Sequence, residues 1–284
     1  MNTSDRAVPA HIRQAARGQR SRPDAKHVTW AARLAPRLSP RAIAAGATLL
    51  YPRFEPELRR LDDFCPRGGT MVDVGGWYGP WTRRLARRAD SVVTIEPVPH
   101  LACLLAATAA PNVCVAPVAA ADRTGTAQLW LPPGGRGDRG IASLVRRPVH
   151  GAVLDVPCLP LDDLALSEVT FIKVDVDGSE LAVLKGARKT LCRHRPALFI
   201  ELEARIQPLE PVLSLLDGHG YRGWVLPRHH WVPLTDFDLS HHQQRTSHVA
   251  EHGFVRRSVL PHRRYINSVL FLPAPRRPAA TSPG

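Results

Sequence analysis

A glycine-rich turn after one apolar run has the residue types that bind a nucleoside cofactor. Residues 71–75 are predicted to form a strand that contains Asp73, and Gly75, Gly76 and Gly79 mark the turn that follows. Glycine allows the backbone to turn sharply and to approach a ligand, and the helix predicted after Gly79 presents free N–H groups. The pattern predicts a ligand site at the end of this strand.

Glu96 narrows the kind of ligand. It lies 23 residues after Asp73, at the end of the next predicted strand, where a carboxylate can accept both hydroxyls of a ribose. The dinucleotide pattern GxGxxG needs a glycine where this chain has Val74, which disfavours an NAD-dependent enzyme. Asp73 favours a cationic ligand over a pyrophosphate, and S-adenosylmethionine carries a sulfonium and an ammonium. The alternative is an ordinary strand–turn–helix with incidental glycines. The predicted cofactor-binding residues here are Asp73, Gly75, Gly76, Gly79 and Glu96.

A second charged segment follows a later apolar run. In a strand over residues 169–175, Phe171, Lys173 and Asp175 share one face. A central parallel strand is normally apolar on both faces, so buried charges there must be paired, hydrogen-bonded or at the open end of the strand. We predict that Asp175, at the mouth of the cleft, is the catalytic residue, either by positioning the substrate or as the general base.

Short apolar runs alternate with amphipathic stretches along most of the chain. The predicted strands are residues 71–75, 91–95, 113–119, 127–131, 169–175, 197–202, 221–226 and 265–272. The predicted helices are residues 81–89, 101–109, 179–192 and 209–217. This alternation predicts an α/β fold with a doubly wound, mostly parallel sheet and helices on both faces. Ligands bind such sheets at the carboxyl ends of the strands, where the candidate residues lie.

Several of these segments resemble motifs of the FkbM family of S-adenosylmethionine-dependent methyltransferases. Residues 73–82 (DVGGWYGPWT) are similar to its first motif, and residues 171–187 (FIKVDVDGSELAVLKGA) to its most specific one. Weaker similarities cover residues 118–128, 156–164 and 267–273. The similarities follow the family's order over about residues 65–273.

The resemblance implies a Rossmann-like class I methyltransferase fold, with one late antiparallel strand in the sheet. It implies in-line transfer of a methyl group from S-adenosylmethionine to a hydroxyl of a sugar, a glycan or a secondary metabolite. It also places Asp122, after the third predicted strand, near the adenine of the cofactor. The chain departs from the family at Trp77, where asparagine is usual, and at Asp177, where glutamate is usual.

Histidines late in the chain offer a rival general base, because a neutral imidazole can accept a proton near pH 7. They are His219, His229, His230, His241, His242, His248, His252 and His262. A metal site could use these histidines, or Asp175 with Glu201 and Glu203, as ligands. The spacing of neither set matches a zinc template. We predict no metal site.

The formal charge of +13 invites a polyanionic partner, but it is uneven. Residues 1–45 carry +7 and residues 251–284 carry +5, which leaves +1 for residues 46–250. We see no nucleic-acid-binding module, and no DPPY-like tetrapeptide follows the strand that ends at Asp175. These absences disfavour a nucleic-acid methyltransferase that uses the basic arm, which stays an alternative. A non-catalytic nucleoside-binding or interaction protein on the same fold is another.

We predict three parts: a basic, partly disordered arm over residues 1–45, a methyltransferase domain over residues 46–273 and a disordered tail over residues 274–284. No apolar run reaches the roughly 18 residues of a membrane span, and the Arg-rich N-terminus has no signal-peptide core. The five cysteines form no CxxC motif and suggest free thiols in a reducing cytoplasm. The expected partner is a small-molecule or carbohydrate acceptor; the sequence predicts no oligomeric state.

Overall fold

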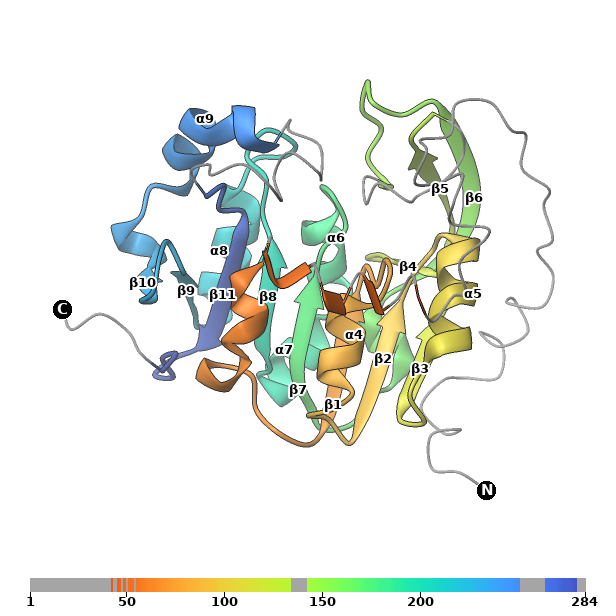
Figure 1. Ribbon diagram of the computed structural model, residues 1–284, viewed down its shortest axis with the longest axis horizontal. Helices are drawn as coiled ribbons and strands as arrows, with labels where there is room; N and C mark the ends of the chain where they lie inside the picture. The colour runs from red at the N-terminus through yellow and green to blue at the C-terminus, as the bar shows by residue number, and fades with distance from the viewer. Residues whose placement is uncertain are drawn as a thin grey trace.

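A computed structural model of the chain describes residues 42, 45, 46, 48, 49, 51–53, 55–133, 142–250 and 264–279 (Figure 1). Most of the predicted arm lies outside the described residues, as do residues 280–284 of the predicted tail. Within residues 274–279, the backbone N–H of Ala279 donates a hydrogen bond to the carbonyl of Asp63. The domain boundaries stay predictions.

An eight-stranded sheet forms the centre of the fold, in the order β10-β9-β11-β8-β7-β1-β2-β3. Its strands are β1 (Thr70–Val74), β2 (Ser91–Ile95), β3 (Val113–Ala116), β7 (Val169–Val174), β8 (Ala197–Glu201), β9 (Tyr221–Val225), β10 (Val232–Pro233) and β11 (Ser268–Pro273). The pairs from β3 to β8 are parallel, whereas β11 runs antiparallel to both β8 and β9. The mostly parallel sheet with one late antiparallel strand is confirmed. The two-residue β10 is a further antiparallel strand that the sequence did not predict.

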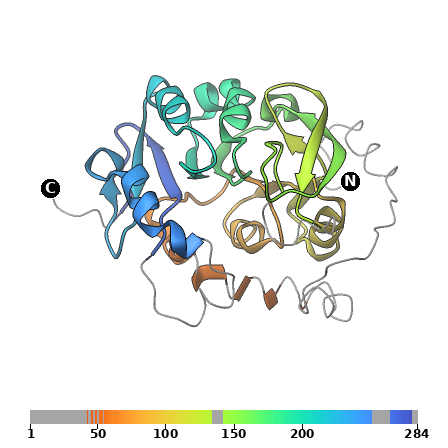
Figure 2. The same ribbon diagram turned by 90° about the horizontal axis from the view of Figure 1, so that it is seen from above.

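Helices cover both faces of this sheet (Figure 2). One side carries α4 (Pro80–Leu85) and α5 (Pro99–Thr108), and the other carries α6 (Glu180–Lys185), α7 (Arg188–His194) and α8 (Glu210–Gly218). On β7, Phe171 packs in the same apolar cluster as Trp81 of α4, while Ile172 packs in the cluster that contains Val183 of α6. The alternation predicted for this strand is therefore confirmed.

A second sheet of three strands stands beside the first, in the order β4-β6-β5. Its strands are β4 (Ala119–Ala120), β5 (Gly125–Leu131) and β6 (Ala152–Leu159). The prediction of one strand over residues 113–119 was wrong, because β3 ends before Pro117, which has no N–H to donate to a neighbouring strand. The chain resumes as β4 in the other sheet.

Two helices differ from the prediction. The single helix expected over residues 179–192 is split into α6 and α7 around Gly186. A Cβ on Gly186 would lie 2.0 Å from the carbonyl oxygen of Ala121, so the chain packs closely here. The helix α9 (Leu239–Ala250) was not predicted, because its sequence is polar and rich in histidine. It is held by a narrow buried stripe that includes Leu239, Gln243 and Val249.

Short 3-10 helices precede β1 and pack against the same face as α4. They are η3 (Tyr51–Arg53), η4 (Pro56–Arg59) and η5 (Leu61–Asp63); η7 (Leu161–Leu164) and η8 (Leu234–Asp236) lie later in the chain. Leu58, Leu61 and Phe64 join the cluster that contains Trp81 and Phe171. In the described part of the chain, no helix is long and apolar enough to cross a membrane.

Candidate active site

Four acidic residues lie at the carboxyl ends of four adjacent strands, β8, β7, β1 and β2, which run side by side through the sheet in Figure 1. Asp73 lies within β1, Glu96 follows β2, Asp175 follows β7 and Glu201 ends β8. Since these strands run parallel and in register, their ends meet at one edge. The structure therefore brings together three of the predicted site residues and adds Glu201.

The glycine turn fits tightly over this edge. Gly75 has φ of 82°, a left-handed conformation, and a Cβ added to it would lie 1.9 Å from the carbonyl oxygen of Asp175. A Cβ on Gly76 would lie 2.4 Å from Cγ2 of Thr94. Gly79 also has a left-handed φ of 80° and immediately precedes α4. The turn after β1 consequently has no room for side chains at Gly75 or Gly76.

Lys173 ties the turn to two of the acids. Its Nζ donates a hydrogen bond of 2.7 Å to the carbonyl oxygen of Gly75, and lies 3.5 Å from Oδ1 of Asp73 and 3.4 Å from Oδ2 of Asp175. Burial would lower the pKa of Lys173, but the charges of Asp175 and Asp73 outweigh it and raise the pKa above its usual value. One buried ammonium thus compensates two carboxylates.

Asp73 is fully buried beneath the turn. Its Oδ2 accepts a hydrogen bond of 2.6 Å from the hydroxyl of Thr82, at the start of α4, whereas its Oδ1 accepts none within the described residues. Burial raises the pKa of Asp73, and the Lys173 ammonium and the Thr82 hydroxyl work against that rise. Asp73 therefore places a buried negative charge directly beneath the glycine turn.

Glu96 fixes the shape of the turn from the neighbouring strand. Its Oε2 accepts a hydrogen bond of 2.8 Å from the backbone N–H of Trp77, and its Oε1 one of 2.9 Å from that of Val98. Burial raises the pKa of Glu96 to about 7 despite these two hydrogen bonds. Each carboxylate oxygen can accept a second hydrogen bond, so Glu96 can hold the turn and still bind hydroxyls.

Sequence reasoning considered Glu201 only as a possible metal ligand. It is half-buried, and its Oε1 accepts a hydrogen bond from Nδ2 of Asn267, the residue before β11. Burial, followed by the charges of Asp175 and Glu203, raises the pKa of Glu201 well above its usual value. The available sequence clue was its position at the end of the strand next to Asp175. Within the described residues, no group of three His, Cys, Asp or Glu side chains could hold a metal ion.

A family model for the methyltransferase FkbM domain matches residues 69–222, which is more than half of the chain and includes the glycine turn, Glu96, Asp175 and Glu201. The chain belongs to the FkbM methyltransferase family. The order of its strands, with β11 antiparallel, agrees with the Rossmann-like class I methyltransferase fold. A comparison with curated proteins finds no match.

The solved structures to which the chain is similar are distant. The FkbM methyltransferase of Methylobacillus flagellatus KT is 19% identical, with 81% of this chain and 60% of that chain covered and a TM-score of 0.42. A precorrin-6y C5,15-methyltransferase of Geobacter metallireducens is 16% identical, with 60% of this chain and 72% of that chain covered and a TM-score of 0.37. A putative S-adenosyl-L-methionine-dependent methyltransferase of Methanococcus maripaludis is 11% identical, with 86% of this chain and 93% of that chain covered and a TM-score of 0.33. This chain therefore spans about 60% of the length of the first.

The two departures from the FkbM motifs occur at unusual backbone conformations. Trp77 has φ of 48°, in the left-handed region that asparagine adopts more readily than most other side chains. The Trp77 ring lies 5.6 Å from that of Tyr51 and 4.8 Å from that of Tyr78. Asp177 has φ of 59° and pairs with Arg147. Ring packing at Trp77 and the ion pair at Asp177 stabilise side chains whose left-handed backbone conformation is unfavourable by itself.

Asp122 follows β4 and is exposed. It contacts a different cavity from the one beside the glycine turn. It lines a cavity of about 570 Å³ between the β5–β6 hairpin and α6, together with Trp130, Ser179 and Lys185. Within the described residues, no hydrogen bond or ion pair joins Asp122 to Glu96. Its predicted place near the adenine stays a prediction.

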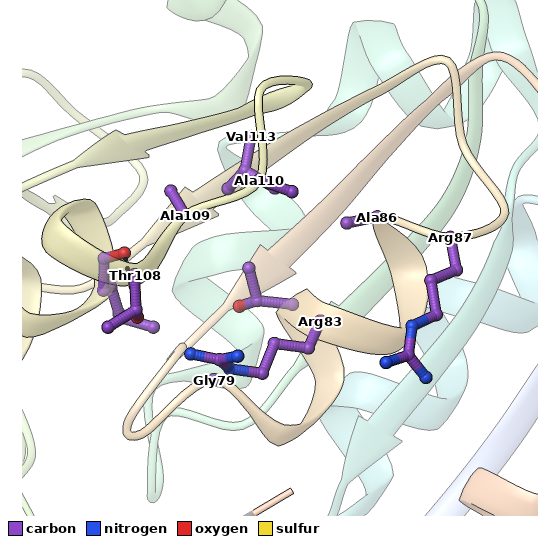
Figure 3. Close-up of a pocket in the computed structure, with 10 residues that line it drawn as sticks. Gly79, Arg83, Ala86, Arg87, Thr108, Ala109, Ala110 and Val113 are labelled. Carbon is purple, nitrogen blue, oxygen red and sulfur yellow. Dashed lines mark hydrogen bonds between the residues drawn. The ribbon is translucent and has the colours of Figure 1, made fainter. Parts of the chain in front are cut away.

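A second pocket lies on the other side of the glycine turn. It has a volume of about 200 Å³ and separates α4 from α5, with Arg83 and Arg87 on one wall and Thr108 on the other (Figure 3). Gly79 and Thr82 contribute to its lining, but the acids at the edge of the sheet do not. The candidate active site is therefore defined by the strand ends.

Two of the late histidines have contacts that do not involve the acids of the site. His219 contacts Sγ of Cys192 at 3.5 Å, and Nε2 of His242 lies 3.1 Å from the carbonyl oxygen of Arg264. Burial lowers the pKa of His242. No described histidine forms a hydrogen bond or ion pair with Asp175. His252 and His262 lie outside the described residues.

Glu55 is a buried carboxyl near the site, and its ionisation lowers the stability of the fold as pH rises. It is buried, and it accepts hydrogen bonds from Nε1 of Trp81 at 2.6 Å and from the hydroxyl of Ser268 at 3.2 Å. Burial, followed by the charge of Glu57, raises its pKa to about 7. A raised pKa means that the folded state binds the proton more tightly, so this contribution to stability is lost as pH rises from about 4.5 to about 7.

We expect Glu55→Gln to raise the free energy of unfolding by about 1–3 kcal/mol at pH 8 and to change it little at pH 5. The amide keeps an acceptor for Trp81 and a polar group for Ser268, but carries no charge to bury. Urea unfolding at pH 5, 6, 7 and 8 measures the effect. A pH dependence as steep as that of the wild type would contradict the assignment, and Glu55→Ala should be destabilised at every pH.

Proposed function

We propose that this FkbM-family methyltransferase transfers a methyl group from S-adenosylmethionine to a hydroxyl of a sugar, a glycan or a secondary metabolite. The observation that carries the proposal is the pair of buried carboxylates, Asp73 and Glu96, at neighbouring strand ends around a turn without room for side chains. A cationic nucleoside ligand matches this charge and shape. When bound, S-adenosylmethionine supplies an already activated methyl group.

The residues present fit such a cofactor. Glu96 has acceptor capacity for the ribose hydroxyls beyond the two backbone N–H groups that it holds. Oδ1 of Asp73 is a buried acceptor without a hydrogen bond in the described structure, and its negative charge favours a cation above the turn. Gly75, Gly76 and Gly79 would give the backbone a close approach to the ligand, and we propose Asp122 for the adenine side.

Asp175 is the proposed catalytic residue on the acceptor side. It is partly exposed at the carboxyl end of β7, beside both the turn and Lys173. A group in this position can orient the acceptor hydroxyl in line with the methyl group, or take its proton. The acidic character of the edge, with Asp175, Asp177 and Glu201, disfavours a phosphate-rich acceptor and hence a nucleic acid.

Free thiols suggest where the enzyme acts. All five cysteines are free, and they include the exposed Cys103 and Cys192. Exposed unpaired thiols are typical of reducing compartments. We therefore propose a cytoplasmic location.

Calorimetry with S-adenosylmethionine tests the cofactor assignment. We expect the full chain to bind it, and Glu96→Gln to weaken binding by about 10- to 100-fold, because hydrogen bonds to a charged group contribute about 1.5–3 kcal/mol each. The matched control is Glu168→Gln, an exposed residue at the opposite end of the sheet, before β7. Equal affinity of wild type and Glu96→Gln would reject the site.

Transfer of radiolabelled methyl groups tests the reaction. The acceptors are a panel of nitrophenyl glycosides, hydroxylated polyketides and, for the alternative, bulk transfer RNA. Transfer to a glycoside or polyketide is the expected result. Binding without any transfer would favour the non-catalytic nucleoside-binding alternative, and transfer to RNA alone would favour the nucleic-acid alternative.

A further inference from the structure

Two acids stand side by side at the centre of the candidate active site but differ in their surroundings. The strands β7 and β8 are parallel and Val174 pairs with Ile200, so Asp175 and Glu201 follow at the same level of the edge. Lys173 lies 3.4 Å from Oδ2 of Asp175 and stabilises its negative charge. In the described part of the chain, no Lys or Arg forms an ion pair with Glu201.

Glu201 is held in place by one oxygen only. Its Oε1 accepts the hydrogen bond from Asn267, and Asn267 also donates to Oε1 of Glu203 at 3.1 Å. Oε2 of Glu201 accepts no hydrogen bond from another described residue. The neighbouring Glu203 is fully engaged instead, because its Oε2 accepts hydrogen bonds from the hydroxyl of Tyr265 and from Nε of Arg205. Glu201 therefore keeps one oxygen available on a fixed side chain that is only half-buried.

The charges around Glu201 increase its affinity for a proton. Desolvation by burial is the main cause, and nearby carboxylates add to it: Asp175 and Asp177 after β7, Glu203 after β8 and Glu55 before η4. The cations near these acids are paired elsewhere: Lys173 with Asp73 and Asp175, Arg147 with Asp177 and Arg205 with Glu203. Tyr51, on η3, also lies close enough for burial and the charges of Glu55, Asp175 and Glu201 to raise the pKa of its hydroxyl. A general base works best when its proton affinity matches the working pH.

We propose that Glu201 is the general base that removes the proton of the acceptor hydroxyl, and that Asp175, compensated by Lys173, positions the acceptor. The proposal rests on the proposed function and refines it. Oε2 of Glu201 takes the proton while the hydroxyl oxygen forms its bond to the methyl carbon. The bond from that carbon to sulfur breaks, with both electrons going to sulfur, and Glu201 later releases the proton to water. The acidic surroundings favour neutral acceptors over anionic ones.

The first test needs no acceptor. The full chain is labelled with 13C at the glutamate side-chain carboxyls, and the carboxyl resonance that disappears in Glu201→Gln is followed by NMR from pH 4 to 9. We expect a titration midpoint well above that of the glutamates in the urea-unfolded chain, and Asp175→Asn should lower it by removing a neighbouring negative charge. A midpoint no higher than that of the unfolded chain would overturn the proposal whether or not an acceptor is known.

The second test uses the acceptor panel described above. We expect Glu201→Gln to bind S-adenosylmethionine within twofold of the wild type and to lower kcat at pH 7 at least 100-fold, within the range for loss of a general base. Asp175→Asn should raise KM as well as lower kcat. Glu210→Gln, an exposed glutamate on α8, is the matched control and should match the wild type.

The possible failures are distinguishable. If the wild type does not bind S-adenosylmethionine, the proposed function fails. If the wild type transfers methyl groups and Glu201→Gln does so within threefold, only the role of Glu201 fails. If the wild type binds the cofactor but methylates nothing in the panel, the carboxyl titration decides the proposal. A midpoint well above that of the unfolded chain's glutamates supports it, and one no higher than theirs rejects it.

Discussion

Replacing Lys173 by methionine is expected to lower the free energy of unfolding by about 3–5 kcal/mol. Methionine fills a similar volume but removes the ammonium that lies between Asp73 and Asp175. Asp73 is fully buried and would retain only the hydroxyl of Thr82 as a partner. A buried carboxylate without a counter-charge is costly, so the loss should grow as pH rises and Asp73 is forced to ionise.

A double variant separates charge from packing. If the lost stability comes from the uncompensated charge, Lys173→Met with Asp73→Asn should recover at least half of it, because the neutral amide no longer needs a cation. Lys185→Met on α6 is the matched control, since Lys185 is exposed, and its effect should stay within about 0.5 kcal/mol. Urea unfolding at pH 7 measures all four proteins. A loss below about 1 kcal/mol for Lys173→Met would show that the ion pairs contribute little.

The same buried ammonium explains why this part of the site was readable from sequence. Lys173 and Asp175 interrupt a strand that is otherwise apolar, and charged groups in a central parallel strand need partners close by. Their partners, Asp73 and the Gly75 carbonyl, lie on the adjacent strand β1 and its turn. A local pattern was informative here because each residue sits at a strand end, where neighbouring parallel strands meet.

Other parts of the site depend on contacts between distant segments, which local patterns do not contain. Glu201 ends an ordinary apolar strand, and its significance comes from Asp175 on the next strand and from Asn267, 66 residues later in the chain. Trp77 adopts a left-handed conformation and donates its N–H to Glu96, which follows the neighbouring strand β2. The resemblance to the family showed that Trp77 is unusual but not that its backbone is left-handed.

The errors in the predicted fold have both local and long-range causes. The predicted strand over residues 113–119 continued across Pro117 because the apolar pattern continued, although proline cannot join the ladder. The predicted helix over residues 179–192 ignored Gly186, which packs against the backbone of Ala121, just after β4 of the second sheet. Since α9 is stabilised by a narrow stripe that includes Gln243, whose amide bonds to the carbonyls of Leu202 and Ile266, hydrophobic periodicity could not reveal it.

The second large effect is expected at the glycine turn. Gly75→Ala should lower the free energy of unfolding by about 2–5 kcal/mol, because a left-handed conformation costs about 1–2 kcal/mol and overpacking about 1–3 kcal/mol more. The added Cβ would meet the carbonyl oxygen of Asp175 at 1.9 Å, and that oxygen belongs to the backbone and cannot rotate away. The end of β7 must move, and Asp175 moves with it. Binding of S-adenosylmethionine should weaken together with stability.

Gly218→Ala is the control for this substitution. Gly218 ends α8, no heavy atom lies within 4 Å of the position of an added Cβ, and its backbone is not left-handed. Alanine there should raise stability by about 0.4–1 kcal/mol, by restricting the unfolded chain. Urea unfolding and calorimetry with S-adenosylmethionine compare the two variants. If Gly75→Ala stayed within about 1 kcal/mol of the wild type and kept its cofactor affinity, the close contact between the turn and β7 would not be what shapes the site.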